Sequence, residues 1–108
     1  MEISAEILNK ALSFSMEFGE NWLKDIHARL QAAYPQLKPD EVDYCNRLCK
    51  KVNKLSHDLV LKNPIKVADG IRMMDLTELK AALDLKYAWI NEANLSAIHS
   101  QSCYYALK

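Results

Sequence analysis

The segment from Val42 to Leu61 constrains the fold of this chain more than any other stretch. Apolar or small side chains recur along it at steps of three and four residues, and they are Val42, Cys45, Leu48, Cys49, Val52, Leu55, Ser56 and Leu59. Because an α-helix turns by about 100° per residue, these positions gather on one half of a helical wheel. The pattern therefore predicts a helix with one buried face, which includes both cysteines.

The opposite half of this predicted helix is polar and mostly basic. It holds Arg47, Lys50, Lys51 and Lys54, with Asn46 and His57 beside them. A solvated helix face is the simplest interpretation, while an acidic protein surface and nucleic-acid phosphates are two alternative partners. The whole chain has 14 basic and 14 acidic residues and a net charge of zero. This balance is unlike that of a dedicated nucleic-acid-binding domain.

Length and turn residues favour a single helical domain. A chain of 108 residues has the common size of one domain, so we expect one domain over residues 1–108. The sequence has only two glycines and three prolines, whereas an all-β fold needs a turn signal every ten residues or so. The expected class is therefore all-α.

Two long helices are expected in the first half of the chain. The first extends from Ile3 or Ser4 to Ala33, with Ser4 as its N-cap and the pair Tyr34 and Pro35 at its end. The second begins at Pro39 and continues to about Lys62. Because the link between them is only five residues long, the two helices are expected to be antiparallel neighbours.

The second half predicts a short connector and a third long helix. Residues 64–70 are expected to form one or two helical turns between Asn63 and the next helix. Asp75 and Glu78 have the spacing of a capping box, so the third helix should begin near Leu76 and continue to about Tyr104. A break around residues 91–94 would give a fourth, C-terminal helix. The predicted fold is an antiparallel bundle of three long helices, with this fourth helix left open.

Most kinds of reactive site are not indicated by the sequence. Cys45 and Cys49 share one helix face but lack the further ligands that a structural zinc site needs, so both are interpreted as core thiols. His99 and Cys103 could meet one turn apart, but no oxyanion-binding device accompanies them. Neither glycine belongs to a phosphate-binding loop. We expect no cofactor, no bound metal and no enzymatic activity.

An aromatic ladder on the first helix is the second candidate partner surface. Phe14, Phe18 and Trp22 follow one another at steps of four residues, so they share one face of the helix. Such a stripe can belong to the core. It can also be a homodimer or partner face, because a small three-helix domain has a limited interior and exposed aromatic patches usually mark interfaces.

Lys86 is the third candidate. The helical wheel places it among apolar positions that include Leu83, Trp89 and Ile90. Its ammonium group is expected to reach solvent or to lie over the ring of Trp89. If the group were buried instead, it would need an acidic partner and would become a candidate functional contact.

Together these features predict a non-catalytic, small helical protein-interaction module, such as an adaptor, a regulator or an inhibitor, that self-associates as a homodimer. The alternatives are a nucleic-acid-binding regulator that uses the basic face, and an enzyme or ligand-binding bundle with an unrecognised site. No stretch approaches the ~18 to 20 apolar residues of a membrane span, and the acidic N-terminal segment does not resemble a secretory signal. A cytoplasmic location without a membrane partner is therefore expected.

Overall fold

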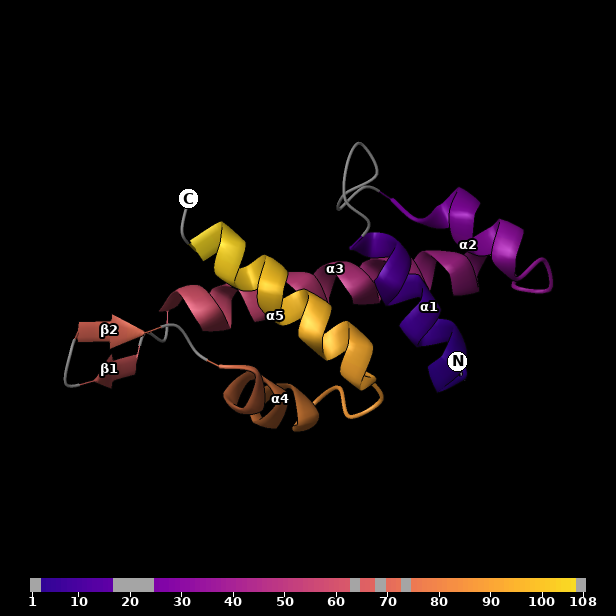
Figure 1. Ribbon diagram of the computed structural model, residues 1–108. Coiled ribbons are helices and arrows are strands. Elements are labelled where there is room, and N and C mark those ends of the chain that lie inside the picture. Colours follow the sequence, from indigo (N-terminus) through magenta and orange to yellow (C-terminus); the bar gives the residue numbers. More distant parts are fainter. Residues whose placement is uncertain (1–2, 17–24, 63–64, 68–69, 73–74, 107–108) are drawn as a thin grey trace. The chain divides into compact units, whose positions relative to one another are not determined.

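The computed structural model of this protein describes residues 3–16, 25–62, 65–67, 70–72 and 75–106 (Figure 1). Its elements are α1 (Ala5–Ser15), α2 (His27–Ala33), α3 (Pro39–Lys62), β1 (Ile65–Val67), β2 (Gly70–Arg72), α4 (Leu76–Asp84) and α5 (Glu92–Ala106). The chain forms two compact units, Met1–Lys51 and Val52–Lys108, and the boundary between them falls within α3. The all-α class is confirmed, with one short two-stranded ribbon in addition.

In the first unit, α1 begins at the residue that the sequence indicates. The side chain of Ser4 accepts a hydrogen bond from the backbone N–H of Ile7 at 3.3 Å, which satisfies one of the free donors of the first turn. Leu8, Ala11 and Leu12 form the buried stripe of the helix, and they pack in the core of the unit where α1 contacts α2. The backbone N–H of Met16 closes the end on Ser13.

The prediction of one continuous helix from residue 3 or 4 to Ala33 is wrong. Asp25 and Ile26 are not helical, and α2 begins only after them, with Ile26 as its N-cap. The periodic apolar pattern continues through these residues because Ile26 is a buried core side chain, only 1% exposed, although its backbone is not part of a helix. The apolar period at this position therefore reflects burial of the side chain and not a helical backbone.

The bounds of α3 agree with the predicted second helix, and its apolar seam is confirmed as core. Val42, Cys45, Cys49 and Val52 are all at most 2% exposed. The start of the helix is acidic, as expected from the helix dipole, and the carboxylate of Glu41 accepts a hydrogen bond from the backbone N–H of Lys38 at 2.8 Å. The placement of Asn46 on the solvent side is wrong, because its side chain is buried.

Residues 65–67 and 70–72 form a β-ribbon, so the helical turns predicted for the connector over residues 64–70 are wrong. Strands β1 and β2 pair antiparallel, with Ile65 opposite Arg72 and Val67 opposite Gly70. The β-branched residues of this stretch, Ile65, Val67 and Ile71, favour extended backbone over helix. This local preference outweighed the helix start that the Asn-Pro pair suggested.

The C-terminal part contains two helices, so the alternative with a separate C-terminal helix is confirmed. The predicted capping box at the start of α4 is also confirmed, since Asp75 accepts from the N–H of Glu78 and the Glu78 side chain accepts from the N–H of Asp75. The helix ends at Asp84, where the N–H groups of Lys86 and Tyr87 both bond to the carbonyl of Leu83. The predicted break at residues 91–94 therefore lies at 85–91 in the structure.

The start of α5 explains the misplaced break. The side chain of Asn91 accepts a hydrogen bond from the backbone N–H of Asn94 at 2.8 Å, which is the contact of an N-capping residue. The polar run that begins at Asn91 thus starts a helix. Only α3 exceeds 15 residues among the described helices, so the expectation of three long helices is not confirmed. No helix in the described part of the chain is long and apolar enough to cross a membrane.

Candidate functional site

The basic residues that were predicted as a partner surface are partly neutralised within the first unit. Arg47 lies one turn after Asp43 on α3, and its guanidinium nitrogen is 2.7 Å from Oδ2 of that carboxylate. The other oxygen of Asp43 is 3.3 Å from Nε2 of His27, at the start of α2. All three side chains are about half exposed or more, so the ion pairs add little to stability, but they reduce the positive potential of this surface.

Lys50 is neutralised in the same way by Asp25. Its Nζ lies 2.6 Å from Oδ1 of Asp25, and the side-chain amide of Asn46 donates to the same oxygen at 3.2 Å. These two hydrogen bonds, that of Lys50 first, hold the pKa of Asp25 below its ordinary value of 3.8. Asn46 also accepts a hydrogen bond from the backbone N–H of Ile26 at 3.1 Å. The sequence pattern missed both Asp25 and Asn46, because their contacts are about 20 residues apart along the chain.

Two of the four predicted basic residues remain exposed cations. Lys51, at the end of the first unit, and Lys54, at the start of the second, are exposed, and no ion pair joins either of them to another residue in the described ranges. Sites for nucleic-acid phosphates usually gather several uncompensated Lys or Arg side chains on one face. The ion pairs of Arg47 and Lys50 leave a much weaker positive surface than the sequence suggested.

Phe14 is the one member of the predicted aromatic ladder that the structure describes; Phe18 and Trp22 lie outside the described residues. Phe14 is half-buried, with Nζ of Lys10 5.1 Å and Cζ of Arg29 5.8 Å from the centre of its ring. Arg29 also donates a hydrogen bond to the backbone carbonyl of Phe14 at 2.6 Å. Two cations of this chain therefore contact the Phe14 ring, which limits the part of it that is open to a partner.

Lys86 is exposed, and its ammonium group lies over a different aromatic ring from the one expected. Its Nζ is 5.6 Å from the centre of the Tyr87 ring, and the expected contact with Trp89 is replaced by an edge-on contact between Tyr87 and Trp89. Tyr87 is buried, so Lys86 covers one part of its surface while the charge stays in water. The buried form of Lys86 with an acidic partner is excluded.

The thiols of the protein are poorly suited to nucleophilic chemistry. Burial, with a smaller contribution from Glu41, raises the pKa of Cys45 to about 11, and burial raises the pKa of Cys49 to about 12. Sγ of Cys103 lies 3.6 Å from Nε2 of His99, but burial raises the pKa of this thiol too. A reactive cysteine needs the opposite shift, because the thiolate is the nucleophile.

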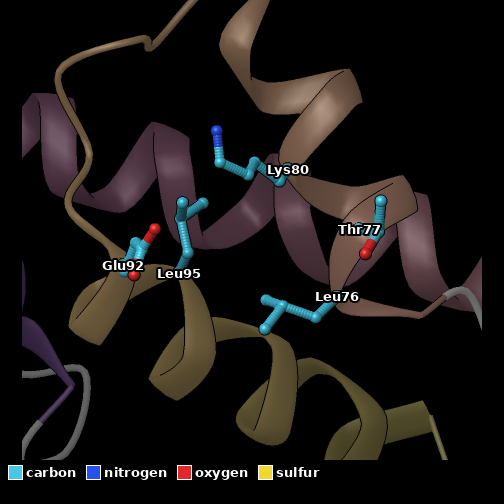
Figure 2. A pocket seen from close by; sticks show the side chains of 5 residues that line it. All are labelled: Leu76, Thr77, Lys80, Glu92 and Leu95. Atoms are coloured by element: carbon cyan, nitrogen blue, oxygen red, sulfur yellow. The ribbon is translucent and has the colours of Figure 1, made fainter.

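A pocket between α4 and α5, in the second unit, was not foreseen from the sequence. Its volume is about 250 Å³, and it is lined by Leu76, Thr77, Lys80, Glu92 and Leu95. Figure 2 shows these side chains around a common space, the first three from α4 and the last two from α5. Leu95 is a buried core residue, whereas Leu76 is 37% exposed. The pocket is thus an open depression with apolar side chains and charged neighbours.

The two charged residues of the pocket differ in their ion pairing. Nζ of Lys80 lies 3.0 Å from Oδ2 of Asp84, one turn later on α4, so its charge is largely compensated. Glu92 is the first residue of α5 and is exposed, and the described residues offer it no ion pair. The capping box indicates from the sequence where α4 starts, but the pocket also depends on the separate start of α5, which the sequence did not place.

Neither metal-ligand groups among the described residues nor related proteins indicate a function. The described residues contain no group of three or more His, Cys, Asp or Glu side chains that could hold a metal ion. Comparisons of the chain with protein-family models, with curated proteins and with solved structures find no match.

Proposed function

We propose that this protein is a non-catalytic interaction module that docks another protein chain through the α4–α5 pocket. The observation that carries the proposal is the pocket itself, with Leu76 exposed at its edge and Leu95 buried inside it. An apolar recess beside an exposed leucine can bury the side chain of a partner, and such anchor residues supply much of the binding energy at protein interfaces.

The size of the pocket favours a protein partner over a small-molecule substrate. Sites for drug-sized ligands and cofactors usually measure roughly 300–1,000 Å³, and this pocket measures about 250 Å³. A cavity of roughly 150 Å³ is already enough for benzene. The pocket therefore suits one side chain better than it suits a whole ligand. The raised pKa values of the three thiols also support a non-catalytic role.

Self-association and a cytoplasmic location belong to the same proposal. A second copy of the chain is the simplest protein partner, and the exposed Leu61 and Tyr104 of the second unit offer further apolar contacts. In this proposal the secondary contact residues are the predicted aromatic residues Phe14, Phe18 and Trp22 and the exposed lysines Lys51, Lys54 and Lys86. The three cysteines are free thiols, as is usual in a reducing compartment.

The decisive experiment compares two leucine variants against a purified partner. The protein would be used to recover a partner from the cells that express it, and the affinity of that purified partner would then be measured. Leu76→Gln should weaken binding about tenfold or more, because it places an amide at the edge of the apolar pocket. Leu85→Gln is the matched control, since Leu85 is 90% exposed and does not line the pocket. Equal affinities for the two variants would contradict the proposal.

Self-association has its own test. Sedimentation velocity of the wild-type protein over a range of concentrations should show a mass that rises toward that of two chains. Leu76→Gln should shift this rise to higher concentration, whereas Leu85→Gln should shift it less. A mass of one chain at every concentration would remove the homodimer from the proposal.

A further inference from the structure

We infer that the α4–α5 pocket recognises an apolar side chain that stands next to a cationic group, as in a leucine beside a lysine or arginine in a partner protein. This inference rests on the proposed function and specifies the chemistry of the partner. The apolar part of the requirement follows from Leu76 and Leu95, which lie on either side of the space that Figure 2 shows. Thr77 and Lys80 also line the pocket, and the methylene stem of a lysine side chain is apolar.

The cationic part follows from the balance of charge around the pocket. Lys80 would favour an anionic ligand if its charge were free, but Asp84 lies 3.0 Å from it and compensates that charge. Glu92 keeps a full negative charge with no ion pair to any residue that the structure describes. A ligand that enters the pocket therefore meets a net negative side.

The helix dipole of α5 does not reverse this balance. Glu92 is the first residue of α5, and a helix N-terminus corresponds to roughly half a positive charge. The carboxylate of Glu92 carries a whole negative charge, so about half a negative charge remains. The remaining field favours an ammonium or guanidinium group on the part of the ligand that stays outside the pocket.

The test uses three small probes that share one branched alkyl group and differ only in charge. They are 3-methylbutylammonium, 3-methylbutanol and 3-methylbutanoate, each titrated into the full-length protein while the methyl NMR signals of Leu76 and Leu95 are followed. All three should shift these signals, because the alkyl group fills the same space. The ammonium should bind up to about fivefold more tightly than the alcohol, as expected for an exposed ion pair, and the carboxylate should bind most weakly.

Glu92→Gln separates the charge from the apolar contact. In this variant the ammonium and the alcohol should bind equally, while the affinity of the alcohol stays as in the wild type. Glu6→Gln makes the same change in the first turn of α1, in the other unit, and should leave the order of the three probes unchanged. An ammonium that binds no better than the alcohol in the wild type would overturn the inference, and so would an unchanged preference in Glu92→Gln.

Failure of this inference can be distinguished from failure of the proposed function. If Leu76→Gln weakens the purified partner but the three probes bind alike, the pocket docks a protein without the charge preference, and only this inference fails. If the probes bind in the expected order but no protein partner depends on Leu76, the preference for cations stands and the protein-docking role fails.

Discussion

Asn46 of α3 accepts a hydrogen bond from the backbone N–H of Ile26 at 3.1 Å, although the two residues are 20 positions apart in the sequence. Ile26 is the N-cap of α2 and has no capping hydrogen bond from its own side chain. Because the Asn46 side chain is only 6% exposed, this contact replaces water at a buried backbone donor. The relationship fixes the place where α2 begins against α3.

Removal of the Asn46 side chain should therefore destabilise the protein. Asn46→Ala leaves the N–H of Ile26 buried without its acceptor, which costs about 1–3 kcal/mol of unfolding free energy. Urea denaturation measures the effect. Lys51→Ala, on an exposed position of the same helix, is the control and should change the free energy by less than about 0.5 kcal/mol. Equal losses in the two variants would show that the Asn46 contact is not needed.

The carboxylate of Asp25 should titrate below its ordinary pKa of 3.8, because Lys50 and Asn46 both donate hydrogen bonds to its charged form. Lys50→Ala should raise the pKa of Asp25 toward 3.8, whereas Lys51→Ala should leave it in place. Carbon NMR of the carboxyl signal measures this pKa directly. An Asp25 signal that titrates identically in the two variants would contradict the role of Lys50.

The pH dependence of stability from this pair follows from the direction of the shift. The folded protein binds the Asp25 proton less readily than the unfolded chain does, so the contribution of the pair is present above pH 3.8. It is lost as the pH falls through the lowered folded value. Because Asp25 is on the surface, the effect should be small and should weaken further at high salt.

His57 gives the opposite kind of pH dependence, near neutrality. Burial lowers the pKa of His57 from 6.5, with a smaller opposing effect of Asp58. Below pH 6.5 the unfolded chain therefore binds more protons than the folded protein, and stability falls as the pH drops toward the lowered folded value. Above 6.5 the histidine is neutral in both states and contributes no pH dependence.

The comparison with His57→Gln isolates this effect. The free energy of unfolding, measured with urea between pH 7 and pH 5, should decrease more steeply for the wild type than for the variant. The other two histidines are common to both proteins, so the difference between the two curves reports His57 alone. Parallel curves would show that burial of the His57 ring does not disfavour its charged form.

The sequence predicted those parts of the fold that depend on local patterns. The bounds of α3, the cap at Ser4 and the capping box at Asp75 all follow from residues within one or two helical turns of each other. The prediction of the first helix was wrong at Ile26, because a buried side chain preserves the apolar period whether or not its backbone is helical. The prediction of helical turns where β1 and β2 lie was wrong because two local signals compete in this stretch, the Asn-Pro pair that suggests a helix start and the β-branched residues that favour strands.

The candidate site was harder to predict from the sequence, because it depends on residues that are distant in the sequence. The partner of Arg47, Asp43, is one turn away on α3, but Lys50 is neutralised by Asp25, which helical periodicity had placed within another helix. The pocket likewise needs α4 and α5 to be separate helices that contact each other. A single sequence gives the charge of Lys80 and Glu92 but not which space they share.

The buried thiols should resist alkylation in the folded protein. With a pKa of about 12, only about one Cys49 side chain in ten thousand is a thiolate at pH 8, and the thiolate is the reactive form. Iodoacetamide should therefore modify Cys103, which is half-buried, well before Cys45 and Cys49. Mass spectrometry of the peptides measures the three rates, and urea should make them alike. Fast native modification of Cys49 would contradict its place in the core.

The capping box of α4 should contribute both to stability and to the shape of the pocket. Asp75→Ala removes the acceptor for the N–H of Glu78 and should cost about 1 kcal/mol of unfolding free energy. The first two residues of α4, Leu76 and Thr77, line the pocket, so fraying of this turn should also weaken the binding of 3-methylbutanol there.

Asp84→Ala is the control at the other end of the same helix. It removes only the exposed ion pair with Lys80, which is expected to cost less than about 0.5 kcal/mol. It also frees the positive charge of Lys80 beside the pocket, so this variant should bind 3-methylbutanoate better than the wild type does, while Asp75→Ala should weaken the alcohol without such a gain. Urea denaturation and the methyl signal of Leu95 measure the two effects. If Asp75→Ala left both stability and alcohol binding unchanged, the first turn of α4 would not depend on its cap.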